Sequence, residues 1–379
     1  MLPLLIGLAL QTAGGGQAPE IIVRAARTER ALADCLAAGC ATDDDVRLSM
    51  ADAEARFANG DYRGARDTLG RAIDRTRPAA ARYPRGVAAL YEARATVNLH
   101  HGDMEAYRTS IAGQARTLRA HLPAGDPQVL MVTIQLGDAW LKQRDAFEAR
   151  RQFAAAARGF TDRGDHGLAA LSTLRIASVA LARGRLGEAR SIVERITRGP
   201  GGADPAVARA AAVMSARIGA RANDDRSVEK LLATLRTDAG KPPMLISEAR
   251  YVPDTQERLS NDALGGRNVG TPRPGDLRPL LSTDIGYSIE ADGSVSDIEI
   301  LRGSRNQDWA GPLVPRIASR RYAPIAVPPG HPGLYRIERF TRRANQVMAT
   351  GSLTRRAAGA IQIESLDLTR DPAAAAPAS

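Results

Sequence analysis

Residues 136–156 decide the fold class; they read LGDAWLKQRDAFEARRQFAAA, with a polar break at Arg144-Asp145. Apolar residues recur three and four positions apart on both sides of that break, which predicts two amphipathic helices joined by a short turn. A small residue, Ala149, stands five positions after Arg144, where it lets the second helix approach the first closely. The stretch therefore predicts one helical hairpin.

The same turn pattern recurs along the first two thirds of the chain. Its copies are Gly60-Asp-Tyr-Arg-Gly-Ala65, Gly102-Asp-Met-Glu-Ala-Tyr107, Arg144-Asp-Ala-Phe-Glu-Ala149 and Gly184-Arg-Leu-Gly-Glu-Ala189, with a degenerate copy near residues 223–225. Successive turns lie 42, 42 and 40 residues apart. A regular period of this size indicates a solenoid of stacked helical hairpins, here over residues 19–240.

The third copy resembles the tetratricopeptide repeat (TPR), through Leu136-Gly137 with Trp140 in its first helix and Ala149, Phe153 and Ala156 in its second. The resemblance covers roughly residues 43–240, although these units exceed the family's usual length of about 34 residues. It implies a non-catalytic array that binds peptides or proteins. A generic α-helical bundle is the alternative.

Residues 1–18 resemble a secretory signal peptide, with an apolar stretch at Leu2–Ala13 and small residues before a cleavage site near Ala18. A buried N-terminal helix is the alternative. Cleavage would place the chain in the periplasm. In that oxidising compartment Cys35 and Cys40 are expected to form a local disulfide. Two reduced thiols or half a metal site are the other readings, and a metal site is disfavoured because no His or further Cys lies nearby.

The chain of 379 residues carries a formal net charge of +10, and only 4% of its residues are aromatic. No basic run is interleaved with stacking aromatics, which disfavours nucleic acid as a partner. No segment is apolar enough for an integral membrane span. His100-His101 is interpreted as a solvated helix end. Asp43-Asp44-Asp45 is read as a helix N-cap with acidic first-turn residues.

The helical period stops at Gly240, and residues 241–280 are predicted to be a linker rich in proline and glycine. In the following domain, residues 281–370, the period changes to that of strands. The predicted order is a strand at Ile285–Ile289, a turn at Asp292-Gly293, a strand with a bulge near Ser296-Asp297, a helix over Trp309–Arg321, and strands at Gly333–Arg343 and Ala360–Leu368. Pro312 and Pro315 are expected to shorten or break the start of that helix. Met244–Val252 could add a further strand. Residues 371–379 are expected to be a disordered tail.

This domain resembles the C-terminal domain of TonB-type energy transducers. The matching residues are IEADGSVSDIEILRGS at 289–304, followed by a helix and Arg321-Tyr322-Ala-Pro324. The resemblance implies a small αβ domain with an antiparallel sheet that engages envelope proteins by strand pairing. The candidate edge residues are Tyr335, Ile337 and Phe340, with Ile361–Leu366 as a second stretch. A purely structural role at the end of the solenoid is the alternative.

Together these features predict an α+β chain: an all-α, TPR-like solenoid followed by a TonB C-terminal-like domain. The expected function is a non-catalytic interaction scaffold of the cell envelope, with envelope proteins or peptides as partners and a link to TonB-type transport. No catalytic, cofactor-binding or metal-binding residue stands out. The alternatives are an enzyme of unrecognised type, or a surface protein that binds anionic lipid or polysaccharide through arginines such as Arg316, Arg320, Arg321, Arg342 and Arg343.

Overall fold

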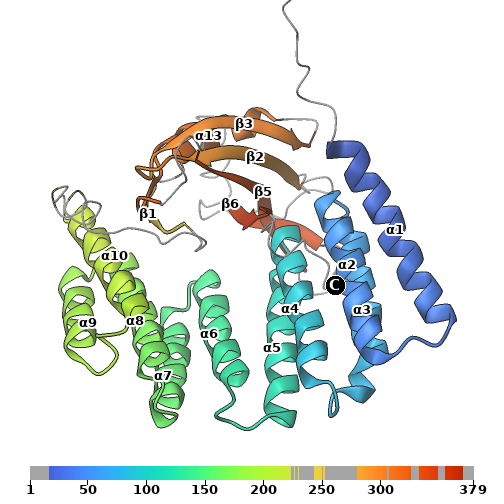
Figure 1. Ribbon diagram of the computed structural model, residues 1–379, viewed down its shortest axis with the longest axis horizontal. Helices are drawn as coiled ribbons and strands as arrows, with labels where there is room; N and C mark the ends of the chain where they lie inside the picture. The colour runs from blue at the N-terminus through green and yellow to red at the C-terminus, as the bar shows by residue number, and fades with distance from the viewer. Residues whose placement is uncertain are drawn as a thin grey trace, which may run out of the picture. The chain divides into compact units, whose positions relative to one another are not determined.

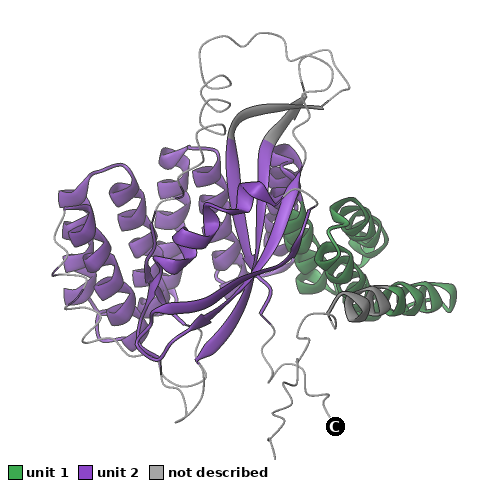
Figure 2. Ribbon diagram, turned by 90° about the horizontal axis from the view of Figure 1, so that it is seen from above, with its two compact units in different colours: residues 1–97 green, residues 98–379 purple. Residues whose placement is uncertain are grey.

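The computed structural model describes residues 17–222, 243–249, 280–304, 307–325, 333–348 and 355–369, with isolated positions 226, 229 and 251. The chain divides into two compact units, residues 1–97 and residues 98–379 (Figure 2). Four predicted features lie outside the described residues: the first 16 residues of the predicted signal peptide (1–18), the degenerate turn at 223–225, most of the 241–280 linker and the tail at 371–379.

The first unit is helical. Its elements are α1 (Gln17–Ala37), α2 (Thr42–Ala58), α3 (Tyr62–Thr76), the 3₁₀ turn η1 (Arg77–Ala79) and most of α4 (Pro84–His101). Phe57, at the end of α2, and Tyr62, at the start of α3, lie edge to face with ring centroids 4.9 Å apart. This contact lies directly across the predicted turn, and both residues are buried.

The second unit continues the helical hairpins and adds two sheets. Its helices are α5 (Met104–His121), α6 (Pro127–Lys142), α7 (Ala146–Asp162), α8 (His166–Ala182), α9 (Leu186–Arg198) and α10 (Pro205–Arg221). Consecutive helices from α6 to α10 lie side by side (Figure 1). The prediction of a helical-hairpin repeat is confirmed.

The turn pattern works through its first two residues. Gly60, Gly102 and Gly184 have φ values of 80°, 86° and 74°, and Arg144 holds the same left-handed conformation with φ 63°. This conformation ends a helix and is easiest for glycine. In the first three turns the next residue is an aspartate whose carboxylate accepts the backbone N–H three residues later, which caps the following helix. Arg185 takes that place in the fourth turn and makes no side-chain cap.

Small residues let the paired helices approach each other. Ala65, Ala149 and Ala189, each five positions after its turn, are fully buried. In the third hairpin Gly137 of α6 faces Phe153 of α7 so closely that an added Cβ would lie 2.4 Å from the ring. The Leu-Gly and phenylalanine positions of the repeat therefore form one interlocking contact.

The larger sheet is antiparallel, with strand order β3-β2-β5-β6. Its strands are β2 (Leu281–Ile289), β3 (Val295–Gly303), β5 (Leu334–Met348) and β6 (Arg355–Asp367). A second, two-stranded sheet joins β1 (Leu245–Ser247) to β4 (Arg321–Tyr322). One face of the larger sheet carries Ile285, Tyr287, Ile289 and Phe340, which pack with Trp309, Leu313 and Ile317 into a single core.

Most local predictions for this region are confirmed, with one correction. Gly293 has φ 84° in the predicted turn, and Asp297 has φ 49° where the pairing of β2 and β3 changes register. The helix predicted over Trp309–Arg321 is broken at its start, as Pro312 and Pro315 indicated, but it also ends earlier than predicted, at Ala318. The structure has a 3₁₀ turn, η2 (Asp308–Ala310), and the six-residue helix α13 (Leu313–Ala318). Pro312 precedes α13, and proline cannot continue a helix in its interior.

Candidate functional site

The predicted edge at Tyr335, Ile337 and Phe340 lies on an inner strand. β5 pairs with β2 along Leu334–Arg342 and with β6 from Glu338 onward. Ile337 accepts the backbone N–H of Leu368 at 2.8 Å, and its own N–H goes to the Thr369 hydroxyl at 2.9 Å. Phe340 is fully buried. The prediction of a free edge at Ile337 and Phe340 is therefore wrong, because the sequence does not reveal that β6 folds back onto β5.

The second predicted stretch, Ile361–Leu366, lies on β6, which is an edge strand of the described sheet. Leu368 donates its N–H inward to β5. Because N–H groups alternate in direction along a strand, those of Ile363 and Ser365 point outward. The Ser365 side chain is exposed. β6 thus presents outward backbone donors and acceptors that no described strand pairs with.

The opposite edge, β3, is less suited to pairing. Its register against β2 shifts twice, once between Asp284 and Ile285 and once between Gly286 and Ser288. The second shift contains Asp297 in a left-handed conformation. Bulges of this kind bend a strand and block addition of a further strand. Of the two described edges, β6 is therefore the better template.

His100 is not the solvated residue expected from the sequence. It is 2% exposed, and its Nδ1 lies 2.8 Å from Oγ1 of Thr341 on β5. An added Cβ at the neighbouring Gly102 would lie 2.5 Å from the Ala344 carbonyl oxygen, so β5 passes directly against this helix end. The interpretation as a solvated end failed because the sequence does not show that a distant strand covers it.

The electrostatics around His100 follow from burial. Desolvation lowers the pKa of the imidazole to about 4; Glu364 opposes the shift, and Arg343, Arg339 and Lys142 add to it. Although His100 and Thr341 resemble a base and a nucleophile, Thr341 is 0% exposed, so no substrate reaches the pair. His100 is a structural contact between α4 and the sheet.

Charged side chains connect the helices to the same face of the sheet. Glu364 of β6 accepts from Lys142 of α6 at 2.8 Å and from Arg343 of β5 at 2.6 Å. On that face the Asp284 carboxylate accepts hydrogen bonds from Arg339 and Arg302, both at 2.6 Å. These ion pairs, in which the carboxylates are mostly buried, join the strands to one another and to α6.

Most of the arginines considered for binding an anionic lipid or polysaccharide already pair with carboxylates of the chain itself. Arg320 is 3% exposed and binds both oxygens of Glu338, and Arg343 is 2% exposed. Arg316 pairs with Glu248 at 2.5 Å. Arg321 is exposed. Arg316, Arg320 and Arg343 therefore do not contribute to an exposed cationic patch, because each is paired with a carboxylate.

A cavity of about 510 Å³ opens between α8, α10 and β1. Its apolar lining includes Leu181, Met214 and Leu245, and its polar lining includes Ser178, Arg217, Arg221 and Glu248. Arg217 donates to the backbone carbonyls of Leu245 at 3.0 Å and Ile246 at 3.3 Å, which joins α10 to β1. Sequence reasoning missed this site, since β1 lies in a segment interpreted mainly as linker.

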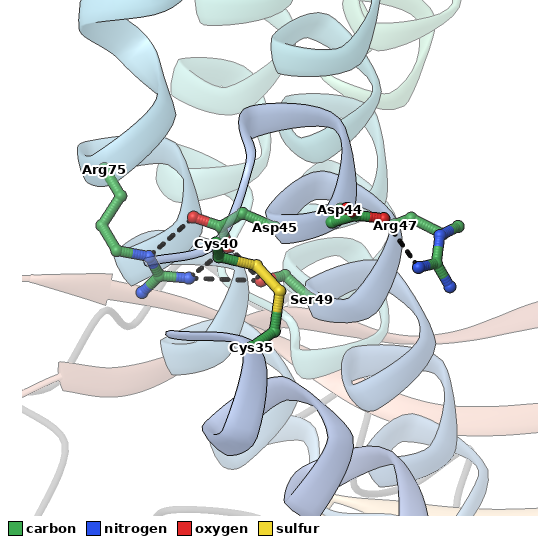
Figure 3. Close-up of a disulfide and its surroundings, with 7 residues drawn as sticks. All are labelled: Cys35, Cys40, Asp44, Asp45, Arg47, Ser49 and Arg75. Atoms are coloured by element: carbon green, nitrogen blue, oxygen red, sulfur yellow. Dashed lines mark hydrogen bonds and ion pairs between the residues drawn. A yellow bond between two sulfur atoms is a disulfide. The ribbon is translucent and has the colours of Figure 1, made fainter. Parts of the chain in front are cut away.

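In the first unit, Cys35 and Cys40 form a disulfide with Cα atoms 4.8 Å apart (Figure 3). Gly39, with φ 81°, turns the chain between them. Beside it Asp45 is buried and accepts two hydrogen bonds from Arg75, at 2.8 and 2.6 Å, and one from Ser49 at 2.9 Å (Figure 3). The N-cap of α2 is Ala41, without a side-chain cap, so the acidic triplet does not cap the helix, although all three residues lie in its first turn as predicted.

Within the described ranges, no group of three or more His, Cys, Asp or Glu side chains could hold a metal ion. In the same part of the chain, no helix has the length and apolar character needed to cross a membrane.

Comparison with known proteins assigns no family. No protein-family model matches the chain, and no curated protein matches it. Similar solved structures include BtubC from P. vanneervenii, with 14% identity over 68% of this chain and 98% of that chain and a TM-score of 0.45. A putative kinesin light chain of Podosopora anserina with TPR-like repeats shows 15% identity over 50% and 93%, with a TM-score of 0.39. The apo form of RapI shows 10% identity over 57% and 58%, with a TM-score of 0.46.

Proposed function

We propose that the chain is an exported, non-catalytic protein-binding scaffold of the cell envelope, in which a partner strand adds to the outer edge of β6. The observation that carries the proposal is the outward-facing backbone of Ile363 and Ser365 on an edge strand of 13 residues. Unpaired strand edges are templates for an extended segment of another protein, which gains main-chain hydrogen bonds on binding.

Two sequence features support the cellular setting. The predicted signal peptide and the Cys35–Cys40 disulfide both fit an oxidising compartment outside the cytoplasm. The order of β2, the Asp292-Gly293 turn, β3, α13 and β5 is the order that the TonB-like motifs imply. The proposed role is that of an adaptor: the sheet binds the partner and the helical hairpins hold the sheet in place through Lys142 and His100.

The test compares three forms of residues 19–379 as bait in crosslinked cell envelopes: wild type, Ser365→Pro and Ser365→Ala. Proline removes the outward N–H of an exposed residue and leaves the inward bonds to β5 in place, whereas alanine keeps that N–H. A partner recovered with wild type and Ser365→Ala but lost with Ser365→Pro supports strand addition. Equal recovery with all three forms would move binding away from β6.

A further inference from the structure

We propose that the cavity between α8, α10 and β1 binds an acidic peptide segment, one carboxylate side chain lying against Arg217 and Arg221 and a neighbouring apolar side chain against Leu181 and Met214. This site is separate from the β6 edge and does not depend on strand addition there. The argument rests on the lining of the cavity, its charge and its size.

The apolar part of the lining comes from two helices and a strand. Leu181 and Ala182 end α8, while Met214 and Ala220 lie on α10 and Leu245 on β1. Its volume of about 510 Å³ lies within the range of about 300–1,000 Å³ usual for ligand pockets. Transfer of an apolar side chain from water into this cavity would be favourable because it removes apolar surface from water.

The polar part carries net positive charge. Arg217 and Arg221 lie one turn apart on α10, and residues at this spacing share a helix face. Arg217 uses Nε and Nη2 to hold β1, so its position is fixed. Arg221 makes no ion pair with any residue that the structure describes. The acidic member of the lining, Glu248, is already neutralised by Arg316 at 2.5 Å and Arg320 at 3.2 Å.

This combination selects the occupant. Two guanidinium groups beside an apolar lining complement a carboxylate adjacent to an apolar group, and guanidinium–carboxylate pairs are among the stronger hydrogen-bonded contacts. The peptide backbone also offers N–H donors to the Ser178 hydroxyl, whose own proton goes to the Leu174 carbonyl. A segment with alternating acidic and apolar side chains meets all three requirements.

The probe is a fluorescein-labelled octapeptide, (Leu-Glu)₄, whose binding to the full chain is followed by fluorescence anisotropy at 50 and 300 mM salt. The comparison peptide (Leu-Gln)₄ has the same apolar positions without charge. Arg221→Gln should weaken binding of (Leu-Glu)₄ about tenfold, and Ala220→Trp, which fills the cavity from an exposed position, should abolish it. The matched control, Arg158→Gln, makes the same charge change at an exposed position of α7.

The proposal predicts that (Leu-Glu)₄ binds more tightly than (Leu-Gln)₄, that salt weakens the difference, and that Arg158→Gln and Ser365→Pro bind as the wild type does. Equal affinity for the two peptides, no binding of (Leu-Glu)₄, or equal losses with Arg158→Gln and Arg221→Gln would overturn it. Circular dichroism spectra matching the wild type are required of each variant. Because Ser365→Pro tests β6 alone, failure of this site and failure of the proposed function give different results.

Discussion

Acidification should weaken the fold through His100, and the size of the effect follows from its burial. The pKa of His100 is lowered from 6.5 to about 4 in the folded chain. Between pH 4 and pH 6.5, His100 is protonated in the unfolded chain and neutral in the folded chain. The free energy of unfolding therefore falls as pH falls from about 6.5 to about 4, by roughly 3 kcal/mol for this group.

Several charged groups face the imidazole and set this value. Glu364 of β6 favours the protonated form, while Arg343 and Arg339 of β5 and Lys142 of α6 disfavour it. Because three cations and burial oppose it, Glu364 alone does not restore the pKa of His100 to its ordinary value. Above about pH 6.5 both states carry neutral histidine, and the contribution is constant.

The assay is urea unfolding followed by circular dichroism from pH 7 to pH 4 at fixed ionic strength, for the wild type and His100→Asn. Asparagine keeps a hydrogen-bonding group near Thr341 but does not titrate. As pH falls, the free energy of unfolding should therefore decrease by roughly 3 kcal/mol more in the wild type than in His100→Asn. His121→Asn, at an exposed position, is the control. Parallel pH profiles for wild type and His100→Asn would refute the burial of His100 against β5.

Three further experiments test contacts within the helical part of the chain. Gly137→Ala should lower the free energy of unfolding, measured with urea or heat, by about 1–3 kcal/mol because its Cβ would meet the buried Phe153 ring. Gly187→Ala has open space around it and should raise the free energy of unfolding by about 0.5–1 kcal/mol. The opposite ranking of the two variants would contradict the close contact between α6 and α7. Cys35→Ser should lower the free energy of unfolding by about 2 kcal/mol under oxidising conditions and by much less under reducing conditions, and an equal effect in both would argue against the disulfide. Asp45→Ala should cost about 2 kcal/mol, since it leaves a partly buried Arg75 without its bidentate partner; Asp44→Ala, an exposed pair with Arg47, should cost well under 1 kcal/mol.

The sequence predicts what depends on local pattern. The recurrent Gly-Asp turns give both the left-handed residue that ends one helix and the aspartate that caps the next, so hairpin positions can be predicted without coordinates. The same holds for the Asp292-Gly293 turn and the bulge at Asp297, where backbone conformation restricts residue choice. At α13 the prolines Pro312 and Pro315 likewise mark the broken start of the predicted helix, whereas no residue marks its early end at Ala318.

The sequence does not predict what depends on contacts between distant segments. His100 and Thr341 are 241 residues apart, and nothing near either one marks the other as its partner. The inner position of β5 depends on β6 pairing with it, which alternation within β5 cannot reveal. Arginine is usually found at the surface, and the burial of Arg320 and Arg343 is explained only by their ion pairs with Glu338 and Glu364. The cavity beside β1 likewise needs α10 and a distant short strand to meet.

The most direct test of the proposed scaffold is hydrogen–deuterium exchange of the β6 segment, residues 355–367, in the full chain alone and bound to the partner recovered with wild type. In the free chain the outward amides of Ile363 and Ser365 should exchange quickly, while the inward amides of Gln362 and Glu364 exchange slowly. Partner binding should slow the outward amides specifically, since the added strand would accept their hydrogen bonds. If these amides are already slow in the free chain, or if bound partner leaves their exchange unchanged, β6 is not the binding edge.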